Sequence, residues 1–303
     1  KLLSPNGVAY VSYNALPGCH IRRMVRDMMR FHVRDLDTPE RRTAQGRALA
    51  GFLAGAIPDS NPLYRKLLEG EMERIGKLSD EVLLHDDLSE LNEAFYFHEV
   101  VARAAPHGLK YLGEALFADM QDQLYSPQVR QTLRASGDLV TCEQYLDFLA
   151  CRAFRQTLFC RSDLALVREL DADRARPFQV VSLARPLSET PDVLSTNVER
   201  FKNLAGTTVG MSYPLAKAAM VTLAEAAPRA LSFDALLAAV RAQLRPAGAP
   251  PVDAETLAQE EQDLGEMLIM AYGGNMLELH LFAPSFVTAA SERPRAGEVA
   301  RAQ

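Results

Sequence analysis

The 303-residue chain has no tryptophan, only four cysteines and no C-x-x-C pair. Cys142 and Cys151 are nine residues apart, and at about 100° per residue this spacing places them on opposite faces of a helix. A shared metal ion or a local disulfide is therefore disfavoured. We expect buried, reduced thiols at Cys19, Cys142, Cys151 and Cys160.

Motifs for self-contained catalysis are also absent. No G-x-S-x-G turn offers a serine nucleophile, and the six histidines show no H-E-x-x-H or other metal-ligand spacing. We therefore expect no metal site, and a self-sufficient hydrolase lacks the residues it would need. His85 and His98 lie beside acidic residues and are candidates for a buried polar network around Asn92 and Tyr96.

The chain has no excess of positive charge and no long apolar run. Its 33 Lys and Arg residues face 39 Asp and Glu residues, which gives a net charge of −6. Phosphate backbones require a basic surface, so nucleic acid is not expected as the main partner. Because no run approaches the roughly 18 apolar residues of a membrane span, we expect a cytoplasmic protein.

The first residues indicate a helix end, a turn and a buried strand. Apolar residues 8–13 are followed by Asn14, Pro17 and Gly18. A buried strand needs neighbours on both edges, and nothing nearby alternates suitably. We therefore expect the partners of this strand to lie upstream of Lys1, and the chain to be the rear part of a larger enzyme.

These residues resemble the late core of class I S-adenosylmethionine-dependent methyltransferases, where a helix ends and the fifth strand of the sheet begins. The stretch from Tyr13 to His32 is similar to a narrower group, the bacterial protein-lysine-type methyltransferases that carry a methyltransferase regulatory domain. Similar motifs cover nearly the whole chain, at Leu84-His85, Asn92 to Phe97, His107 to Glu114, Glu143 to Phe148, Phe154 to Leu158, Glu278 to His280 and Ser291 to Pro294.

The expected fold is mainly α (α+β) and has three parts. Residues 1–18 are a remnant of a Rossmann-like sheet, 19–187 a helical regulatory domain and 188–303 a winged-helix-like domain, with the boundary at the proline-containing segment 188–195. Residues 155–160 have strand character and are expected to return to the sheet.

Apolar spacing and capping residues predict the individual elements. In the first part, helices are expected at about 21–32, 39–57, 62–76, 88–104, 127–135 and 139–153. In the second part, we expect a strand at 178–183, a hairpin at 198–202 and 208–212, helices opened by Pro214, Ser232 and Asp253, and a strand at 277–281.

The resemblance implies a cofactor that this chain does not hold. A class I fold binds S-adenosylmethionine on a glycine-rich turn after its first strand, and the 17 glycines here are scattered. We expect no cofactor to bind this chain alone, and S-adenosylmethionine to bind the full-length enzyme.

Tyr13, Asn14, Pro17 and Gly18 are the candidate substrate-binding residues. They follow the carboxyl end of a presumed parallel strand, where open α/β sheets place their ligands, and a Tyr hydroxyl and an Asn amide can orient a lysine amine. The alternative is a plain strand-to-helix turn in which Pro-Gly reverses the chain.

A second group of candidates is regulatory or forms an interface. Phe95, Tyr96 and Phe97, next to His98, form the densest aromatic cluster, which suits either a core or an interface. Arg26 and Arg30 belong to a cationic helix face, which is either simply solvated or docks an acidic protein segment.

The implied function is the regulatory and substrate-recognition portion of a methyltransferase that acts on protein lysines, inactive without its catalytic domain. Its partners would be a protein substrate, that catalytic domain and, across an exposed strand edge, a second copy of the chain as a homodimer. The alternative is a winged-helix nucleic-acid-binding or protein-interaction module. Against nucleic acid, residues 253–272 contain six acidic residues and no Lys or Arg.

Overall fold

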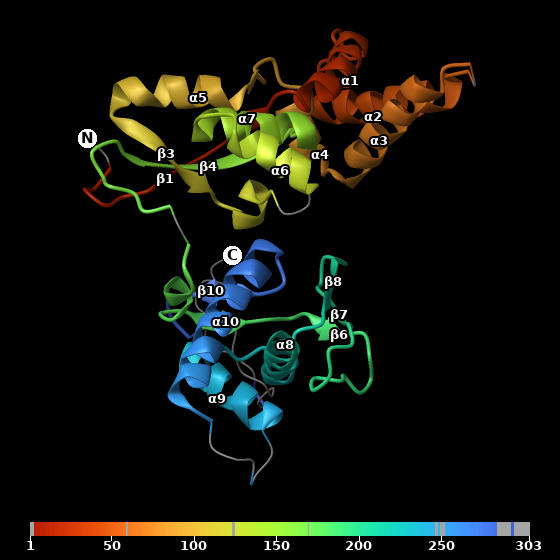
Figure 1. The fold of residues 1–303 in the computed structure, drawn as a ribbon. Helices are drawn as coiled ribbons and strands as arrows, with labels where there is room; N and C mark the ends of the chain where they lie inside the picture. The colour runs from red at the N-terminus through yellow and green to blue at the C-terminus, as the bar shows by residue number, and fades with distance from the viewer. Residues whose placement is uncertain are drawn as a thin grey trace. The chain divides into compact units, whose positions relative to one another are not determined.

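The computed structural model describes residues 3–283 except 59, 123–124, 169, 246–247 and 249–251, together with 292–293. The chain divides into two compact units, Lys1–Leu166 and Val167–Gln303 (Figure 1). The division lies earlier than the predicted boundary at 188–195, because residues 179–181 and 185–186 already pair with later strands of the second unit.

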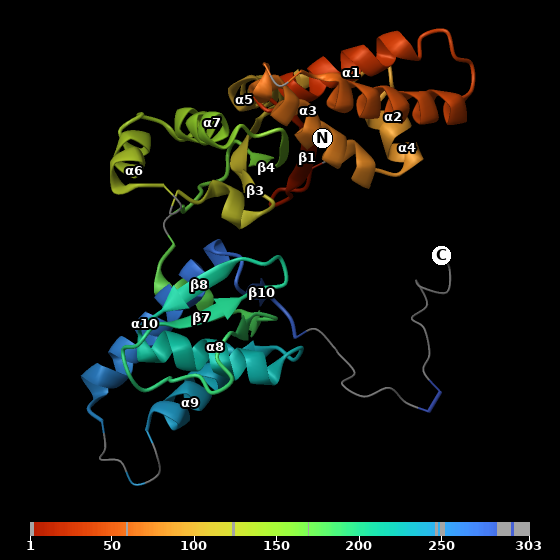
Figure 2. The same ribbon diagram turned by 90° about the vertical axis from the view of Figure 1, so that its right-hand side faces the viewer.

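Three helices form one end of the first unit, and the views in Figures 1 and 2 agree that they lie side by side. They are α1 (Cys19–His32), α2 (Pro39–Ala56) and α3 (Pro62–Lys77), followed by the short α4 (Asp80–Val82) and a π-helical turn at Leu83–Asp87. Thr38 caps α2, since its side chain accepts a hydrogen bond from the Arg41 N–H. Their apolar faces bury a common core that includes Val25, Met29, Leu68, Ile75 and Leu83.

A four-stranded sheet forms the rest of this unit, in the order β2-β1-β4-β3. Its strands are β1 (Ala9–Ala15), β2 (Ala94–Phe95), β3 (Leu109–Glu114) and β4 (Phe154–Arg161). Strand β4 runs antiparallel to β1, from Ala9 opposite Phe159 to Asn14 opposite Phe154. The predicted return of residues 155–160 to the sheet is confirmed.

The expectation that β1 finds its partners only upstream of Lys1 is wrong. Strand β4 pairs along β1, and β2 lies parallel to its last two residues. The strand is also less buried than predicted, with Tyr10 55% and Val11 40% exposed. The period-2 pattern could not show this, because the partner strand comes about 140 residues later in the sequence.

Helices α5 (Phe97–Ala104) and α7 (Leu139–Ala150) lie on the same side of the sheet in both views. The helix predicted for 88–104 is correct only from Phe97 onward, because residues 94–95 join the sheet as β2. Helix α6 (Pro127–Arg134) and short 3-10 turns at Ala105–His107 and Phe117–Met120 complete the unit.

The second unit follows the predicted order of a hairpin, three helices and a strand. Its elements are a 3-10 turn at Ala172–Ala175, β5 (Gln179–Val181), β6 (Arg185–Pro186), β7 (Glu199–Lys202), β8 (Thr208–Met211), α8 (Pro214–Ala226), β9 (Leu231–Ser232), α9 (Phe233–Leu244), α10 (Ala254–Gly273) and β10 (Glu278–His280). The strands form two small sheets, β10-β5-β9 and β6-β7-β8. The core of the unit includes Phe201, Met220, Leu236 and Leu268.

The segment predicted as a linker is held in place by a buried lysine. Lys217 of α8 has no exposed surface, and its Nζ donates to the carbonyl oxygens of Asp192, Ser195 and Asn197 at 2.5, 2.7 and 3.0 Å. Residues 192–197 are therefore part of the folded unit. Among the described residues, no helix has both the length and the apolar character to cross a membrane.

Candidate functional site

The predicted substrate-binding residues lie where β1 ends and the chain turns into α1. The Asn14 amide donates to the Asn92 side-chain oxygen at 2.8 Å, and the Asn92 amide in turn donates to the Asp86 carbonyl. The Gly18 N–H donates to the Arg152 carbonyl at 2.9 Å. This end of the sheet is thus tied both to the loop before β2 and to the end of α7.

Gly18 has a steric role that the sequence did not reveal. A Cβ atom at this position would lie 2.3 Å from the Cys151 carbonyl oxygen and 2.6 Å from the Arg152 carbonyl carbon. Only glycine allows the turn to approach α7 so closely. Its part in substrate binding, like that of Pro17, stays a prediction.

Tyr13 and Asn14 take different partners because successive side chains of a strand point to opposite faces. The Tyr13 hydroxyl lies 3.2 Å from the Thr157 hydroxyl of β4, and burial raises the pKa of Tyr13 to about 12. Asn14 instead lines a cavity beside α1. The structure therefore places Tyr13 as a support for the sheet and leaves Asn14 accessible at its carboxyl end.

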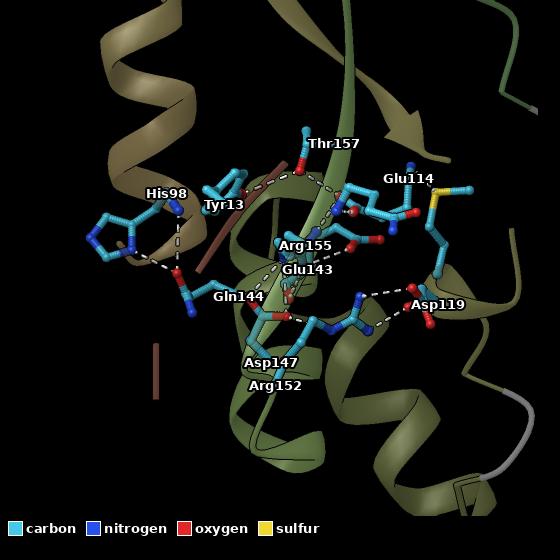
Figure 3. A network of polar contacts seen from close by, with 12 residues as sticks. Tyr13, His98, Glu114, Asp119, Glu143, Gln144, Asp147, Arg152, Arg155 and Thr157 are labelled. Carbon is cyan, nitrogen blue, oxygen red and sulfur yellow. Dashed lines mark hydrogen bonds and ion pairs between the residues drawn. The ribbon is translucent and has the colours of Figure 1, made fainter. Parts of the chain in front are cut away.

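Next to Tyr13 lies a buried ionic network that the sequence analysis did not predict (Figure 3). The Arg155 guanidinium contacts three carboxylates, Glu114 at 2.5 Å, Glu143 at 3.1 Å and Asp147 at 2.9 Å. Thr157 donates to Glu114 at 3.0 Å, so Tyr13 is linked to the network through one hydroxyl group.

The electrostatics of this network follow from its burial. Desolvation raises the pKa values of Glu143 and Asp147, and the charge of Arg155 offsets this only in part. Burial alone would lower the pKa of Arg155, but its hydrogen bond to Asp147 and the charge of Glu114 raise it overall. A second guanidinium, Arg152, lies 2.9 Å from Asp147, so three carboxylates share two cations.

A sequence signal for this network existed. Glu114 and Arg155 are charged residues within strands, and Glu143 and Asp147 are four residues apart, which places them on one face of α7. All four lie in motifs that carry the family resemblance, but spacing alone did not bring the three elements together.

The aromatic cluster is divided between core and surface. Phe97 is fully buried, with its ring 4.9 Å from that of Tyr111 and 4.0 Å from the Arg155 guanidinium. Of the two alternatives given for this cluster, Phe97 therefore follows the core one, because its side chain supports the ionic network from inside.

Its neighbours Phe95, Tyr96 and His98 stay predicted interface residues. Tyr96 stacks on the exposed His98 and meets the exposed Phe148 edge-on, with ring centres 5.7 and 6.1 Å apart. The ring of Phe95 lies 4.5 Å from the Arg103 guanidinium.

The buried polar network predicted for His85 and His98 around Asn92 and Tyr96 is wrong, because both histidines are exposed and only His98 contacts Tyr96. The exposed His85 contacts Asp86 at 2.9 Å, whereas His98 contacts Gln144 at 2.8 Å. The two histidines thus take separate partners, and Asn92 contacts neither.

The cysteines are free, but only Cys19 and Cys160 are buried, whereas Cys151 is exposed and Cys142 half-buried. Cys151 ends α7 in the left-handed conformation, with φ 47°, which brings it to the surface. Among the described residues, no three His, Cys, Asp or Glu side chains are grouped to hold a metal ion.

The turn after β1 does not fit S-adenosylmethionine. The cofactor needs an open glycine-rich turn after a strand, whereas Gly18 is packed against the backbone of Cys151 and Arg152.

Comparison with known proteins defines the class of this fold and site. Residues 79–161 match the family described as "Predicted methyltransferase regulatory domain". The matched residues include β2, β3, β4 and the ionic network. This part of the chain, residues 79–161, is thus similar to a methyltransferase regulatory domain.

Two solved structures extend the match over nearly the whole chain. The structure of PKMT2 from Rickettsia typhi has a TM-score of 0.79 and 27% identity, covering 96% of this chain and 55% of that one. PKMT2 in complex with AdoHcy has a TM-score of 0.82 and 26% identity, with 99% and 57% covered. The chain is similar to the C-terminal part of PKMT2.

Curated relatives agree with this match. An uncharacterized protein of Rickettsia prowazekii (strain Madrid E), RP789, is 35% identical over 236 residues, which is 76% of this chain and 43% of that protein. A second, RP028, is 35% identical over 112 residues, or 37% of this chain and 45% of the relative. The chain spans less than half the length of these relatives.

Proposed function

We propose that the chain is the regulatory and substrate-recognition part of an S-adenosylmethionine-dependent methyltransferase that acts on protein lysines. The similarity to PKMT2, a lysine methyltransferase with a structure in complex with AdoHcy, supports both the reaction and its acceptor class. Recognition of the acceptor is then the task of this chain, and the cofactor belongs to a catalytic domain.

The open edge of β1 is the observation that carries the proposal. Among the described residues, β1 pairs with β4 along its length but with β2 only at Asn14 and Ala15. Residues 9–13 therefore present one edge of unpaired backbone groups, and this stretch includes the exposed Tyr10 and Val11. Such an edge accepts a further strand, here one from the catalytic domain.

Completing the sheet at this edge would put the acceptor close to Asn14. Open α/β sheets bind their ligands at the carboxyl ends of parallel strands, and Asn14 lies at that end and lines a cavity. Its amide carries no charge and can orient a lysine amine. Tyr13 is a positioning residue, since its hydroxyl contacts Thr157.

The second candidate is a winged-helix module for nucleic acid, favoured by the three helices and small sheet of the second unit. The charge of α10 opposes it, because this 20-residue helix contains no Lys or Arg. A duplex backbone would meet acidic side chains there.

The test is a chimera in which this chain replaces the matching part of PKMT2. We expect the chimera, supplied with S-adenosylmethionine, to produce methylated lysines detectable by mass spectrometry, and the remainder of PKMT2 alone to produce none. A chimera that binds AdoHcy but methylates no protein lysine contradicts the proposal. Binding of the chain to duplex DNA instead would favour the second candidate.

A further inference from the structure

The cavity beside Asn14 carries an excess of positive charge. It has a volume of about 90 Å³ and is lined by Arg22, Arg23 and Arg26 of α1 and by Arg74 of α3. Its acidic lining residues are Asp86 and Asp87, and Arg74 already holds Asp87 with two hydrogen bonds of 3.2 and 2.7 Å. We call this site the arginine cavity.

Arg26 is the most buried of the four cavity arginines, and its ion pair is long. Its side chain is only 9% exposed, and its guanidinium donates to two neutral groups, the carbonyl oxygens of Ser89 and Glu90. The nearest carboxylate, Asp27, is 3.7 Å away and 57% exposed to solvent. Burial lowers the pKa of Arg26, and the positive charge of Arg30 lowers it further.

One donor of Arg26 is left without a partner. Its Nε is buried and, within the part of the chain that the structure describes, forms no hydrogen bond. A buried cationic donor in this state is unfavourable unless an anion or another acceptor reaches it. Arg26 also lines the cavity, so a small shift of its guanidinium would let an anion there reach this donor.

The N-terminus of α1 adds to the positive potential in the cavity. Cys19 and His20, the first two residues of the helix, also line the cavity. Gly18 offers no side-chain cap, and the first turn contains no acidic residue. The positive end of the helix dipole is therefore not neutralised locally, which favours a bound anion.

We propose that the arginine cavity binds an Asp or Glu side chain of the polypeptide substrate, close to the acceptor lysine. The volume suits a small group such as a carboxylate, and a guanidinium binds a carboxylate through paired hydrogen bonds. Asn14 lines the same cavity, so the acidic residue and the acceptor lie near each other. This inference rests on the proposed function and adds a substrate preference to it.

The test uses two fluorescently labelled peptides and the purified chain without cofactor. Both peptides contain a central lysine, flanked by Glu in one and by Gln in the other. We expect fluorescence anisotropy to show about tenfold tighter binding of the Glu peptide, as for one well-placed charged contact, and this preference to weaken with added salt.

Two matched variants show whether the cavity causes the preference. The double variant R22A/R23A removes two cavity arginines and leaves the buried Arg26 in place, so we expect it to keep the fold and to weaken the preference for the Glu peptide. The control R34A/R41A also removes two positive charges, from exposed arginines outside the cavity, and should keep the preference.

Three results would overturn the inference: equal binding of the two peptides by the unaltered chain, no binding of either peptide, or a preference that R22A/R23A leaves undiminished. The proposed function is judged separately by methyl transfer. A chimera that methylates lysines without regard to acidic neighbours would refute the arginine cavity as a substrate site and leave the proposed function standing.

Discussion

Asp147 of α7 accepts a 2.9 Å hydrogen bond from Nε of Arg155 on β4, and neither side chain has exposed surface. This contact joins the helix layer to the strand that completes the pairing of β1. The sheet end that carries Tyr13 and Asn14 therefore depends on a buried ion pair.

Replacing Arg155 by Ala should destabilise the first unit by about 3–5 kcal/mol, because Glu114, Glu143 and Asp147 would lose their shared cation inside the protein. Urea denaturation followed by circular dichroism measures the change. Arg161→Ala removes an exposed ion pair with Asp163 and should have little effect. Equal stability of the two variants would mean that the network does not hold the unit together.

The pH dependence of stability should reflect the raised pKa of Glu143. Because the native chain holds this proton more tightly than the unfolded chain, stability from this group decreases as pH rises from its ordinary pKa of 4.5 towards the raised value. The free energy of unfolding of E143Q should not show this decrease as pH rises.

Glu73 provides a control, because its pKa is shifted in the opposite direction to that of Glu143. Its hydrogen bond with Lys77 lowers its pKa, so the stability from this group is lost as pH falls towards that lowered value. A wild-type profile that does not differ from that of E143Q above pH 4.5 would contradict the assignment of Glu143.

Gly18→Ala should destabilise the chain by about 2 kcal/mol or more, since the new Cβ would overlap the backbone of Cys151 and Arg152. Thermal unfolding measures this. Gly55→Ala in α2 is the matched control, with nothing within 4 Å of its added Cβ, and should be neutral or stabilising. A tolerated Gly18→Ala would show that the turn can move away from α7.

Lys217→Met should destabilise the second unit by about 3 kcal/mol or more, because three carbonyl oxygens lose their donor. Limited proteolysis should then cut within residues 188–197, which the lysine holds in place. The exposed Lys202 provides the control Lys202→Met, which should resist cleavage like the unaltered chain. Unchanged protection in Lys217→Met would show that other contacts fix this segment.

Local patterns predicted most elements because caps and breakers are local. Ser232 and Asp253 accept hydrogen bonds at the starts of α9 and α10 as expected, and the strand character of residues 155–160 predicted β4. The predicted start of α5 at residue 88 was wrong, because residues 94–95 pair with β1, and this long-range contact leaves no local pattern.

The site was harder to predict for the same reason. The role of Arg26 depends on the carbonyl groups of residues 89–90, more than 60 positions later in the sequence. Helical spacing placed Arg26 on a cationic face that is either solvated or docks an acidic segment, whereas the structure buries its side chain. The ionic network likewise joins β3, α7 and β4, which no single pattern connects.

The central claim is that the end of β1 receives the acceptor lysine. Its most direct test is the rate of lysine methylation by the PKMT2 chimera that carries Tyr13→Phe and Asn14→Ala together. We expect the rate to fall by about tenfold or more, which corresponds to about 1.4 kcal/mol of lost transition-state stabilisation, while AdoHcy affinity changes little. Undiminished methylation by a folded double variant would contradict the claim and leave these residues as parts of a strand-to-helix turn.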